Sequence, residues 1–172
     1  MTETANPAAR AAPAPEGAAF RDAMSQVASA VHVVTTFGVS GRAGLTATAV
    51  ASVSDAPPTV LVCIEGASRT LAAIVANGIF CINTLAGDQQ ELAEIFASRR
   101  GVDGEARFAS AGWEPGNTGA PMLRGSVASF DCRLLTVHKA ATHRILIGEV
   151  VGLGGTTGRP GLIYRRRHFE SV

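Results

Sequence analysis

The most informative stretch of the sequence is a run of small and hydroxyl-bearing residues at 44–54, Gly-Leu-Thr-Ala-Thr-Ala-Val-Ala-Ser-Val-Ser. Small side chains let a flat ring approach the backbone closely, and exposed backbone N–H and C=O groups can bond the heteroatoms along the edge of a flavin-like ring. Ser52 and Ser54, with Ser68 and Arg69 further on, carry side chains that can hold a phosphate. Such residues are also common in barrel strands, so this run indicates a nucleotide site only together with other signals.

The histidines and serines lack the spacing of a known catalytic motif. His138 and His143 flank a turn and could share a metal, but no nearby carboxylate completes a ligand set, so we expect no metal site. His32 lies in an apolar segment and is interpreted as structural. His143 opens a strand after a small polar turn, where a functional role is credible. The sequence Gly-Val-Ser-Gly at 38–41 is not the nucleophile elbow of a serine hydrolase.

Glycine and cysteine patterns also favour structural interpretations. The run Gly-Leu-Gly-Gly-Thr-Thr-Gly at 152–158 is similar to a dinucleotide fingerprint, but Pro160 and another strand follow it instead of a helix. We therefore interpret it as a hairpin loop. Cys63, Cys81 and Cys132 are odd in number and widely spaced, which argues against disulfides or zinc and favours a reducing cytoplasm. Each lies in an apolar run and is expected to be a small core residue.

Composition and charge exclude several classes of partner. The chain has 172 residues, of which 47% are hydrophobic, and a formal net charge of +1. This balance is typical of one soluble globular domain and gives no electrostatic reason to expect a nucleic acid or an anionic membrane. The only basic cluster, at 165–167, suits a solvated edge or the phosphate of a nucleotide. No apolar stretch reaches the length of a membrane span, and the N-terminus lacks a signal-peptide pattern.

The elements that must position these residues are mostly strands. Residues 1–17 are rich in Ala and Pro and are predicted to form a disordered tail, which leaves 18–172 as one domain. A short amphipathic helix is expected from Phe20, with apolar residues at helical spacing as far as Val31. Strands are predicted at 31–37, 45–54, 59–64, 79–84, 125–138, 143–153 and 162–167.

Two further helices and one long loop complete the expected elements. One helix at 69–77 is capped by Ser68 and ended by Asn77-Gly78. Another follows a capping-box pattern formed by Asp88 and Glu91, and 98–120 is predicted to be a long loop. So few helices for about seven strands argue against a doubly wound parallel sheet. We therefore predict a mainly β fold, an antiparallel barrel with peripheral helices.

Several short segments are together characteristic of one family. They are Phe-Arg-Asp-Ala-Met at 20–24, Val-Val-Thr-Thr at 33–36, the run at 44–54, Pro-Pro at 57–58, Ile-Asn-Thr-Leu at 82–85, Arg-Phe at 107–108, Gly-Ala-Pro at 119–121, Phe-Asp-Cys-Arg at 130–133, Thr-His at 142–143, Gly-Glu-Val at 148–150 and Leu-Ile-Tyr at 162–164. In this combination the chain resembles the short-chain flavin reductases that serve two-component flavin-dependent monooxygenases, such as the reductase component of 4-hydroxyphenylacetate 3-monooxygenase. The C-terminus departs from the family's usual Arg-Arg-aromatic-His, because it reads Arg-His-Phe-Glu at 167–170.

The resemblance implies a split β-barrel of the FMN-binding type that works as a homodimer. It places the contacts to the flavin ring and ribityl chain on Thr46, Ala47, Thr48, Ala49 and Val50. It places the phosphate-side contacts on Ser52, Val53, Ala67, Ser68 and Arg69, with a further contact near Arg99. It matches His143 to the histidine that meets the nicotinamide nucleotide.

The function implied by the resemblance is an NAD(P)H:flavin oxidoreductase. NADH or NADPH would reduce FMN or FAD by hydride transfer, with no side chain acting as acid or base, and the reduced flavin would pass to a partner monooxygenase. The segments at 80–87 and 148–153 also resemble cob(II)yrinic acid a,c-diamide reductase, so a corrin is an alternative acceptor. A non-catalytic flavin- or haem-binding split barrel, or a structural dimer with an empty groove, are the alternatives of another class.

Overall fold

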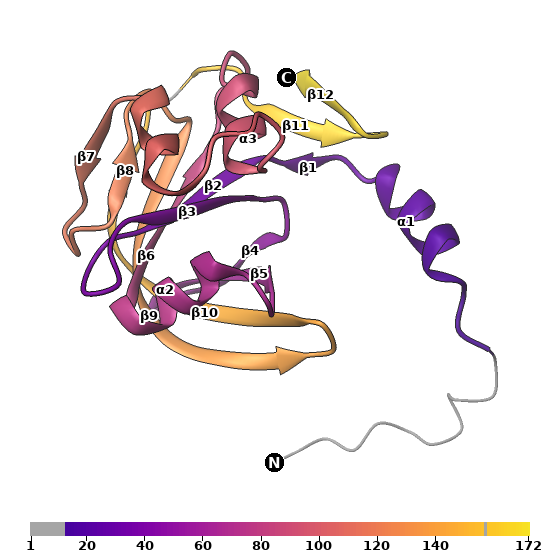
Figure 1. Cartoon of the computed structure of the whole chain (residues 1–172), viewed down its shortest axis with the longest axis horizontal. Helices are drawn as coiled ribbons and strands as arrows, with labels where there is room; N and C mark the ends of the chain where they lie inside the picture. Colours follow the sequence, from indigo (N-terminus) through magenta and orange to yellow (C-terminus); the bar gives the residue numbers. More distant parts are fainter. Residues whose placement is uncertain (1–12, 157) are drawn as a thin grey trace.

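A strongly curled antiparallel sheet of seven strands forms the body of the protein (Figure 1). The structure, a computed structural model, describes residues 13–156 and 158–172. The strand order is β3-β2-β6-β9-β10-β5-β4. The bounds are β2 (His32–Thr36), β3 (Ala43–Ala47), β4 (Val50–Asp55), β5 (Pro58–Glu65), β6 (Ile79–Thr84), β9 (Ala128–Ala140) and β10 (His143–Gly154).

Two smaller sheets and the helices lie around this body. One sheet has the order β1-β11-β12, and the other pairs β7 with β8. The strands are β1 (Ser29–Ala30), β7 (Trp113–Pro115), β8 (Pro121–Leu123), β11 (Leu162–Arg165) and β12 (His168–Ser171). The helices are α1 (Gly17–Ser25), α2 (Arg69–Asn77), α3 (Gln90–Phe96) and a 3₁₀ helix (Gly104–Ser110). None of these helices in the described chain is long and apolar enough to cross a membrane.

The β-rich architecture with peripheral helices is confirmed, with one qualification. β3 and β4 are the two edge strands of the large sheet, and they are not paired with each other in the described part of the chain. The sheet therefore curls but stays open between these edges instead of closing into a complete barrel. An edge strand presents the backbone N–H and C=O groups of alternate residues to whatever lies beside it.

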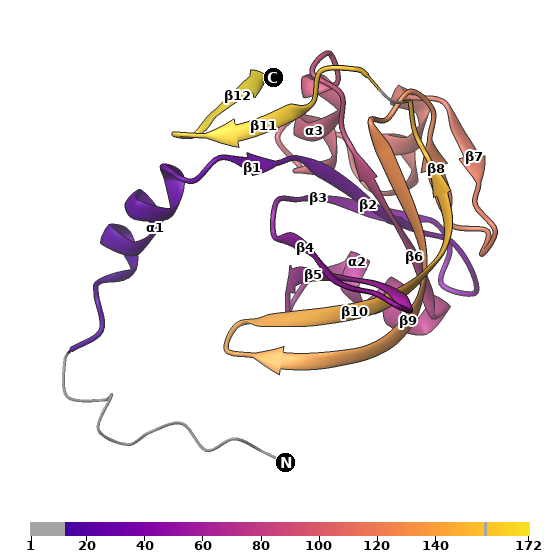
Figure 2. The same ribbon diagram turned by 180° about the vertical axis from the view of Figure 1, so that it is seen from behind.

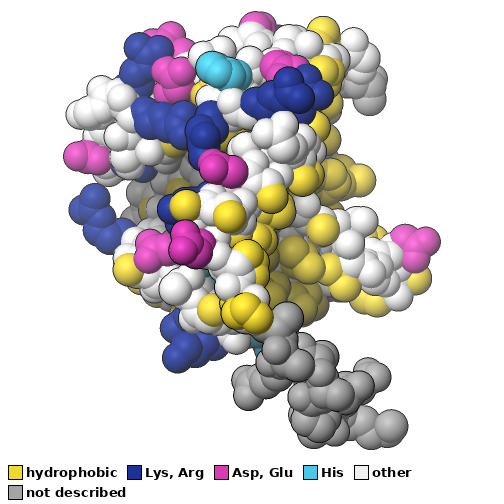
Figure 3. All heavy atoms as spheres, turned by 90° about the vertical axis from the view of Figure 1, so that its right-hand side faces the viewer, with side chains coloured by type: hydrophobic (Ala, Val, Ile, Leu, Met, Phe, Trp, Pro, Cys, Tyr) yellow, Lys and Arg dark blue, Asp and Glu magenta, His cyan; other side chains and the backbone are white. Residues whose placement is uncertain are grey.

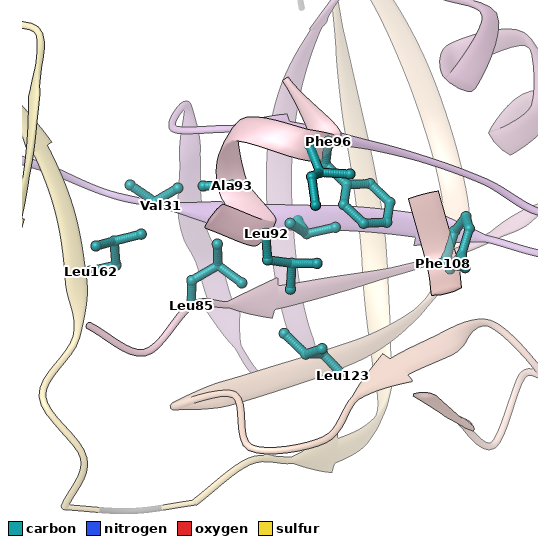
Figure 4. Packing of buried hydrophobic residues seen from close by; sticks show 10 residues of the cluster. Val31, Leu85, Leu92, Ala93, Phe96, Phe108, Leu123 and Leu162 are labelled. Carbon is teal, nitrogen blue, oxygen red and sulfur yellow. The ribbon is translucent and has the colours of Figure 1, made fainter. Parts of the chain in front are cut away.

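Two large hydrophobic clusters, and a small third one formed by Cys81, Ala120 and Met122, hold the elements together. The first, which we call the α3 cluster, packs α3 and the 3₁₀ helix against Val31, Leu85 and Leu162 (Figure 4). The second, the sheet cluster, fills the inside of the curled sheet with residues such as Ile82 and Leu146. α2 covers this second cluster through Leu71 and Ile74 in its buried face.

Local sequence signals explain α2 and β6 well. The Ser68 side chain accepts a hydrogen bond from the backbone N–H of Leu71 at 3.4 Å, which caps α2 as predicted. Gly78 ends the helix with φ 71°, a left-handed conformation that glycine adopts without a steric penalty. β6 has the predicted bounds, and its middle residues are buried.

The N-terminal predictions are partly outside the described residues. Residues 1–12 of the predicted tail lie outside the described residues. The helix α1 begins at Gly17, which was the last residue assigned to the tail. The helix ends at Ser25, so Val31 does not continue its apolar face, and it is instead fully buried in the α3 cluster. α1 itself has no buried residue. The predicted helix was too long, because the apolar residues at helical spacing continue past the end of α1 into the region of the first strand.

The predicted capping box at α3 is wrong. Gln89 is the N-cap, and its side chain makes no capping hydrogen bond. Asp88 instead forms a bidentate ion pair with Arg159, whose Nη2 lies 2.8 and 2.7 Å from the two carboxylate oxygens. The Asp88 carboxylate therefore binds Arg159, which follows β10 in the chain, instead of capping α3.

Two loop predictions and one strand prediction also need correction. The predicted loop at 98–120 contains the 3₁₀ helix and β7. The glycine-rich run does not form a hairpin, because β10 extends to Gly154 and the next strand, β11, belongs to a different sheet. The predicted strand at 162–167 stops at Arg165. The chain turns back at Arg166 and Arg167, both with positive φ, and β12 pairs with β11.

Candidate functional site

A cavity of about 700 Å³ lies beside the open edge of β3. β3 and the link to β4 form one wall, and the start of α2 forms another. The end of α3 closes the cavity on the side of the α3 cluster, and the rim includes the start of β10. The site therefore lies where the curled sheet is open, between elements that come from distant parts of the chain.

Most of the residues predicted for the site line this cavity. Those that do are Thr46, Ala47, Thr48, Ala49, Ser68, Arg69 and His143. Those that lie outside its lining are Val50, Ser52, Val53, Ala67 and Arg99. Ser52 and Val53 are exposed on β4, and Arg99 places its guanidinium 5.7 Å from the ring centroid of Tyr164. For this second group the predicted flavin contacts stay predictions.

The β3 side of the cavity is fixed by contacts to α3 and α2. The Thr46 hydroxyl donates a hydrogen bond to the carbonyl of Ala93 at 2.7 Å, so this side chain anchors β3 to α3. A Cβ at Gly44 would lie 2.7 Å from Cε1 of Phe96, so only glycine fits there. The Thr70 hydroxyl donates to the Gly44 carbonyl at 3.1 Å. β3 therefore presents its outer backbone edge to the cavity in a fixed position.

Arg107 is a buried cation in the cavity wall that the sequence did not mark as a site residue. Its guanidinium donates to the hydroxyl of Ser98 at 2.6 Å and to the carbonyls of Gly44 and Phe96 at 3.4 Å each. It also pairs with the exposed carboxylate of Asp103 at 3.1 Å. One side chain thus ties β3, the end of α3 and the following loop together. The Arg-Phe segment at 107–108 was the only signal for it.

His143 lies at the rim of the cavity and is exposed. It begins β10, where it pairs with Glu65 of β5, and its Nδ1 lies 3.0 Å from the hydroxyl of Thr142. This hydrogen bond can fix the orientation of the imidazole ring and leave Nε2 for a ligand. His138 lies outside the lining of the cavity, so the two histidines do not share this site. No group of three or more metal-ligating side chains gathers in the described residues.

The chain matches a family of known proteins over most of its length. Residues 24–172 match the flavin reductase like domain. The chain belongs to this family. The FMN reductase (NADH) RutF of Ancylobacter novellus is 46% identical over 172 residues, which are 100% of this chain and 93% of that protein.

Solved structures of flavin reductases share the fold as well. BorF, the flavin reductase component of a bacterial two-component tryptophan halogenase, superposes with a TM-score of 0.84 at 33% identity, over 91% of this chain and 98% of BorF. The NADH:FAD oxidoreductase SgcE6 of Streptomyces globisporus does so with a TM-score of 0.82 at 28% identity, over 100% of this chain and 98% of SgcE6. The resemblance inferred from the sequence is confirmed.

The cavity of this flavin reductase-like domain fits a flavin. The small residues Ala47 and Ala49 leave space for a flat ring beside the edge of β3. The first turn of α2 lies at the same cavity, where the helix N-terminus favours an anion and the Arg69 guanidinium adds a positive charge. The cavity can therefore hold both parts of a flavin nucleotide. The backbone groups of β3 suit the ring, and the N-terminus of α2 suits the phosphate.

Buried titratable groups around the domain are structural and not reactive. Burial lowers the pKa of His32 from 6.5 to about 4, and its Nδ1 lies 3.1 Å from the hydroxyl of Thr84, in agreement with the structural role expected for it. Burial raises the pKa of the Cys132 thiol to about 12 and also raises that of Cys81, so both remain protonated core residues, as predicted. Cys63 differs, because it is half-buried and lines the cavity.

Proposed function

We propose that this protein is an NAD(P)H-dependent flavin reductase that binds the flavin beside β3 and meets the nicotinamide nucleotide at His143. The observation that carries the proposal is that the edge of β3, the start of α2 and His143 all line the same cavity. The names of the relatives, an FMN reductase (NADH) and an NADH:FAD oxidoreductase, support the same conclusion.

The protein's contribution is placement and electrostatics. A bound flavin would supply the redox chemistry, since flavins accept hydride from reduced nicotinamide nucleotides. The backbone groups of Ala47 and neighbouring residues would orient the ring, and their N–H dipoles would favour its reduced, negatively charged form. Arg69 and the start of α2 hold the phosphate. His143 orients the nicotinamide nucleotide from the rim, so no side chain must donate or remove a proton.

The first test is anaerobic oxidation of NADH in the presence of FMN, followed at the flavin absorbance band. We expect bleaching that requires the protein. His143→Ala should raise KM for NADH or lower kcat while the Kd for FMN stays unchanged, and His138→Ala, outside the cavity, is the matched control. Unchanged kinetics in His143→Ala would remove this residue from the site. A protein that binds FMN without bleaching it would instead be a non-catalytic flavin-binding module.

We also propose that the reduced flavin leaves to serve a partner monooxygenase. BorF, which acts in a two-component halogenase, provides the analogy. The alternative acceptor is a corrin. The two acceptors can be distinguished because only in the second case is a corrin reduced in the reaction. Addition of a cob(II)alamin-type substrate to the anaerobic assay tests the alternative. Protein-dependent reduction of the corrin, at a rate above that given by free reduced FMN, would favour the corrin reductase and contradict the monooxygenase proposal.

We further propose that the protein is a homodimer in which α1 contributes to the interface. Figure 3 shows hydrophobic side chains gathered on the face that carries α1. Phe20 and Met24 of α1 are 57% and 50% exposed, and no residue of the helix is buried within the chain. Sedimentation should give twice the mass of the chain, and the double change Phe20→Ser with Met24→Ser should shift it toward the monomer. Val75→Ser, an equally exposed residue of α2, is the control.

The proposed location of the enzyme is the cytoplasm. Its three cysteines are free thiols, as suits a reducing compartment where NADH and NADPH are abundant. Fractionation of the producing cells should recover the protein with cytoplasmic enzymes. Recovery with the periplasmic or membrane fraction would contradict this location.

A further inference from the structure

Among the described residues, Arg42 is the only one that lines both the cavity and a second hollow, of about 350 Å³. The hollow lies between the β2–β3 loop and the β7–β8 hairpin, which are side by side in Figure 1 and in Figure 2. Glu105 lines the hollow and directly follows Gly104, which lines the cavity. The two spaces therefore adjoin, and the Arg42 side chain forms part of the wall between them.

The contacts that hold the Arg42 side chain in this position are weak. Its Nη2 pairs with the Glu105 carboxylate at 3.1 Å, but the Glu105 side chain is 71% exposed, and an ion pair in contact with water stabilises a conformation little. Its guanidinium carbon lies 4.5 Å from the ring centroid of Phe108, and the cation–π contact of a partly exposed arginine is also modest.

The Nε atom of Arg42 favours a change of position. It is buried without a hydrogen-bond partner, and no other side-chain nitrogen or oxygen atom in the described residues is in this state. A buried donor without a partner costs free energy, because it has lost the water that would otherwise solvate it. The side chain as a whole is 33% exposed, so it borders solvent. A rotation outward would return water to Nε at the expense of weak contacts only.

Arg107, in the same cavity wall, shows how a fixed arginine differs. Its side chain is 10% exposed, and its guanidinium donates to the Ser98 hydroxyl at 2.6 Å. It also donates to the carbonyls of Gly44 and Phe96. Rotation of Arg107 would break all of these hydrogen bonds, whereas rotation of Arg42 would satisfy a donor that now has no partner.

We propose that the Arg42 side chain is a gate between the cavity and the second hollow. In the inward position that the structure shows, the side chain separates the two spaces. In an outward position it joins them and gives the cavity a second opening beside the exposed ring of Phe37. The inference rests on the proposed function, because it takes a flavin as the occupant of the cavity. The gate sets the rate at which the flavin enters and leaves, and not its affinity.

The second opening lies away from His143. Asn77, at the end of α2, accepts a hydrogen bond from the Ser40 N–H at 2.8 Å, so the β2–β3 loop adjoins the C-terminal end of this helix. The Gly66 N–H, just before the helix, donates to the Thr142 carbonyl at 2.9 Å, so His143 adjoins the N-terminal end. A flavin can therefore exchange through the second opening without passing the nicotinamide nucleotide.

The first test observes the Nε–H group of Arg42 by ¹⁵N NMR in the protein without ligand, with Arg42→Lys to assign the signal by its loss. A side chain that changes position should show a low heteronuclear NOE or relaxation dispersion, according to the time scale of the motion. The Nε–H group of Arg107 is the matched control and should be rigid in both measurements. An Arg42 signal as rigid as that of Arg107 would overturn the proposal.

The second test measures the rate constants of FMN binding by stopped-flow fluorescence. Arg42→Ala removes the gate and should raise the association and dissociation rate constants about tenfold each, with a Kd within about twofold of that of the unchanged protein. Glu105→Gln removes the ion pair from outside the cavity and should raise both rate constants about twofold. Glu114→Gln is the matched control, because Glu114 also lines the hollow but pairs with Arg124. Unchanged rate constants in Arg42→Ala would contradict the gate.

Riboflavin, which lacks the phosphate, separates a gate from a phosphate contact. A gate should change the exchange of riboflavin and of FMN by the same factor in Arg42→Ala. Faster dissociation of FMN alone, with a weaker Kd, would show that Arg42 holds the phosphate and would overturn the gate. A protein with a mobile Arg42 that does not bind FMN would overturn the proposed function and leave the gate standing.

Discussion

The two hydrophobic clusters differ in what they support. The sheet cluster is mostly aliphatic and lies inside the curled sheet, as at Val34, Val62 and Ile82. The α3 cluster is centred on three aromatic residues, with ring centroids of Phe96 and Trp113 each 5.1 Å from that of Phe108. Phe96 of the α3 cluster lines the cavity, and so does Ile64 of the sheet cluster. Both clusters therefore support the fold and reach the cavity, but the α3 cluster also sets the position of β3, because Phe96 packs against Gly44.

The strongest test of this difference is to remove one aromatic ring from each cluster. Phe96 and Phe80 are both almost completely buried, so Phe96→Ala and Phe80→Ala should each lower the free energy of unfolding by about 3–5 kcal/mol. Only Phe96→Ala should also weaken FMN binding, because Phe96 positions β3 at Gly44. Denaturant unfolding and FMN titration at a temperature where both variants are folded measure the two effects. Equal losses of affinity would show that the clusters are not functionally distinct.

A smaller effect is expected from pH, because His32 on β2 is buried in its neutral form. Its pKa is 6.5 when unfolded and about 4 when folded, so between these values the unfolded chain binds the extra proton. The free energy of unfolding should therefore fall by up to about 3 kcal/mol as the pH drops from 6.5 to 4. Urea unfolding of the unchanged protein and of His32→Gln isolates this contribution. A variant with the same pH dependence would exclude His32 as its source, and His168→Gln, an exposed histidine, is the control.

The smallest effect concerns the start of α2, which borders the cavity and covers the sheet cluster. Ser68→Ala removes the N-cap and should lower the free energy of unfolding by about 1 kcal/mol. The same change should weaken binding of FMN while binding of riboflavin, which lacks the phosphate, stays unchanged. Ser68→Thr retains the hydroxyl and should behave like the unchanged protein. Equal weakening for both flavins would place the phosphate elsewhere.

The elements with strong local signals were predictable from the sequence. The cap at Ser68, the Asn77-Gly78 stop and the apolar run of β6 each act within a few residues, so no distant contact was needed to interpret them. The run at 44–54 also predicted one wall of the cavity, since six of its residues, 44–49, line it.

The rest depended on contacts between distant parts of the chain. β7, β8 and β12 are only three or four residues long, too short to show a period. Arg42 carries no sequence signal of a site, and Arg107 has only the Arg-Phe segment at 107–108. The packing of the β2–β3 loop and the 3₁₀ helix beside α3 brings both side chains to the cavity. Asp88 was misread for the same reason, because Arg159 is 71 residues away.

The gap between β3 and β4 also has a thermodynamic consequence. A ligand seated beside β3 contacts elements that the unfolded chain cannot bring together, so its binding energy adds to the free energy of unfolding. A ligand at a hundred times its Kd adds about 2.7 kcal/mol. A ligand bound at the opening between β3 and β4 therefore helps to hold the two edges of the sheet in place. The melting temperature of the protein should then rise with the concentration of free ligand.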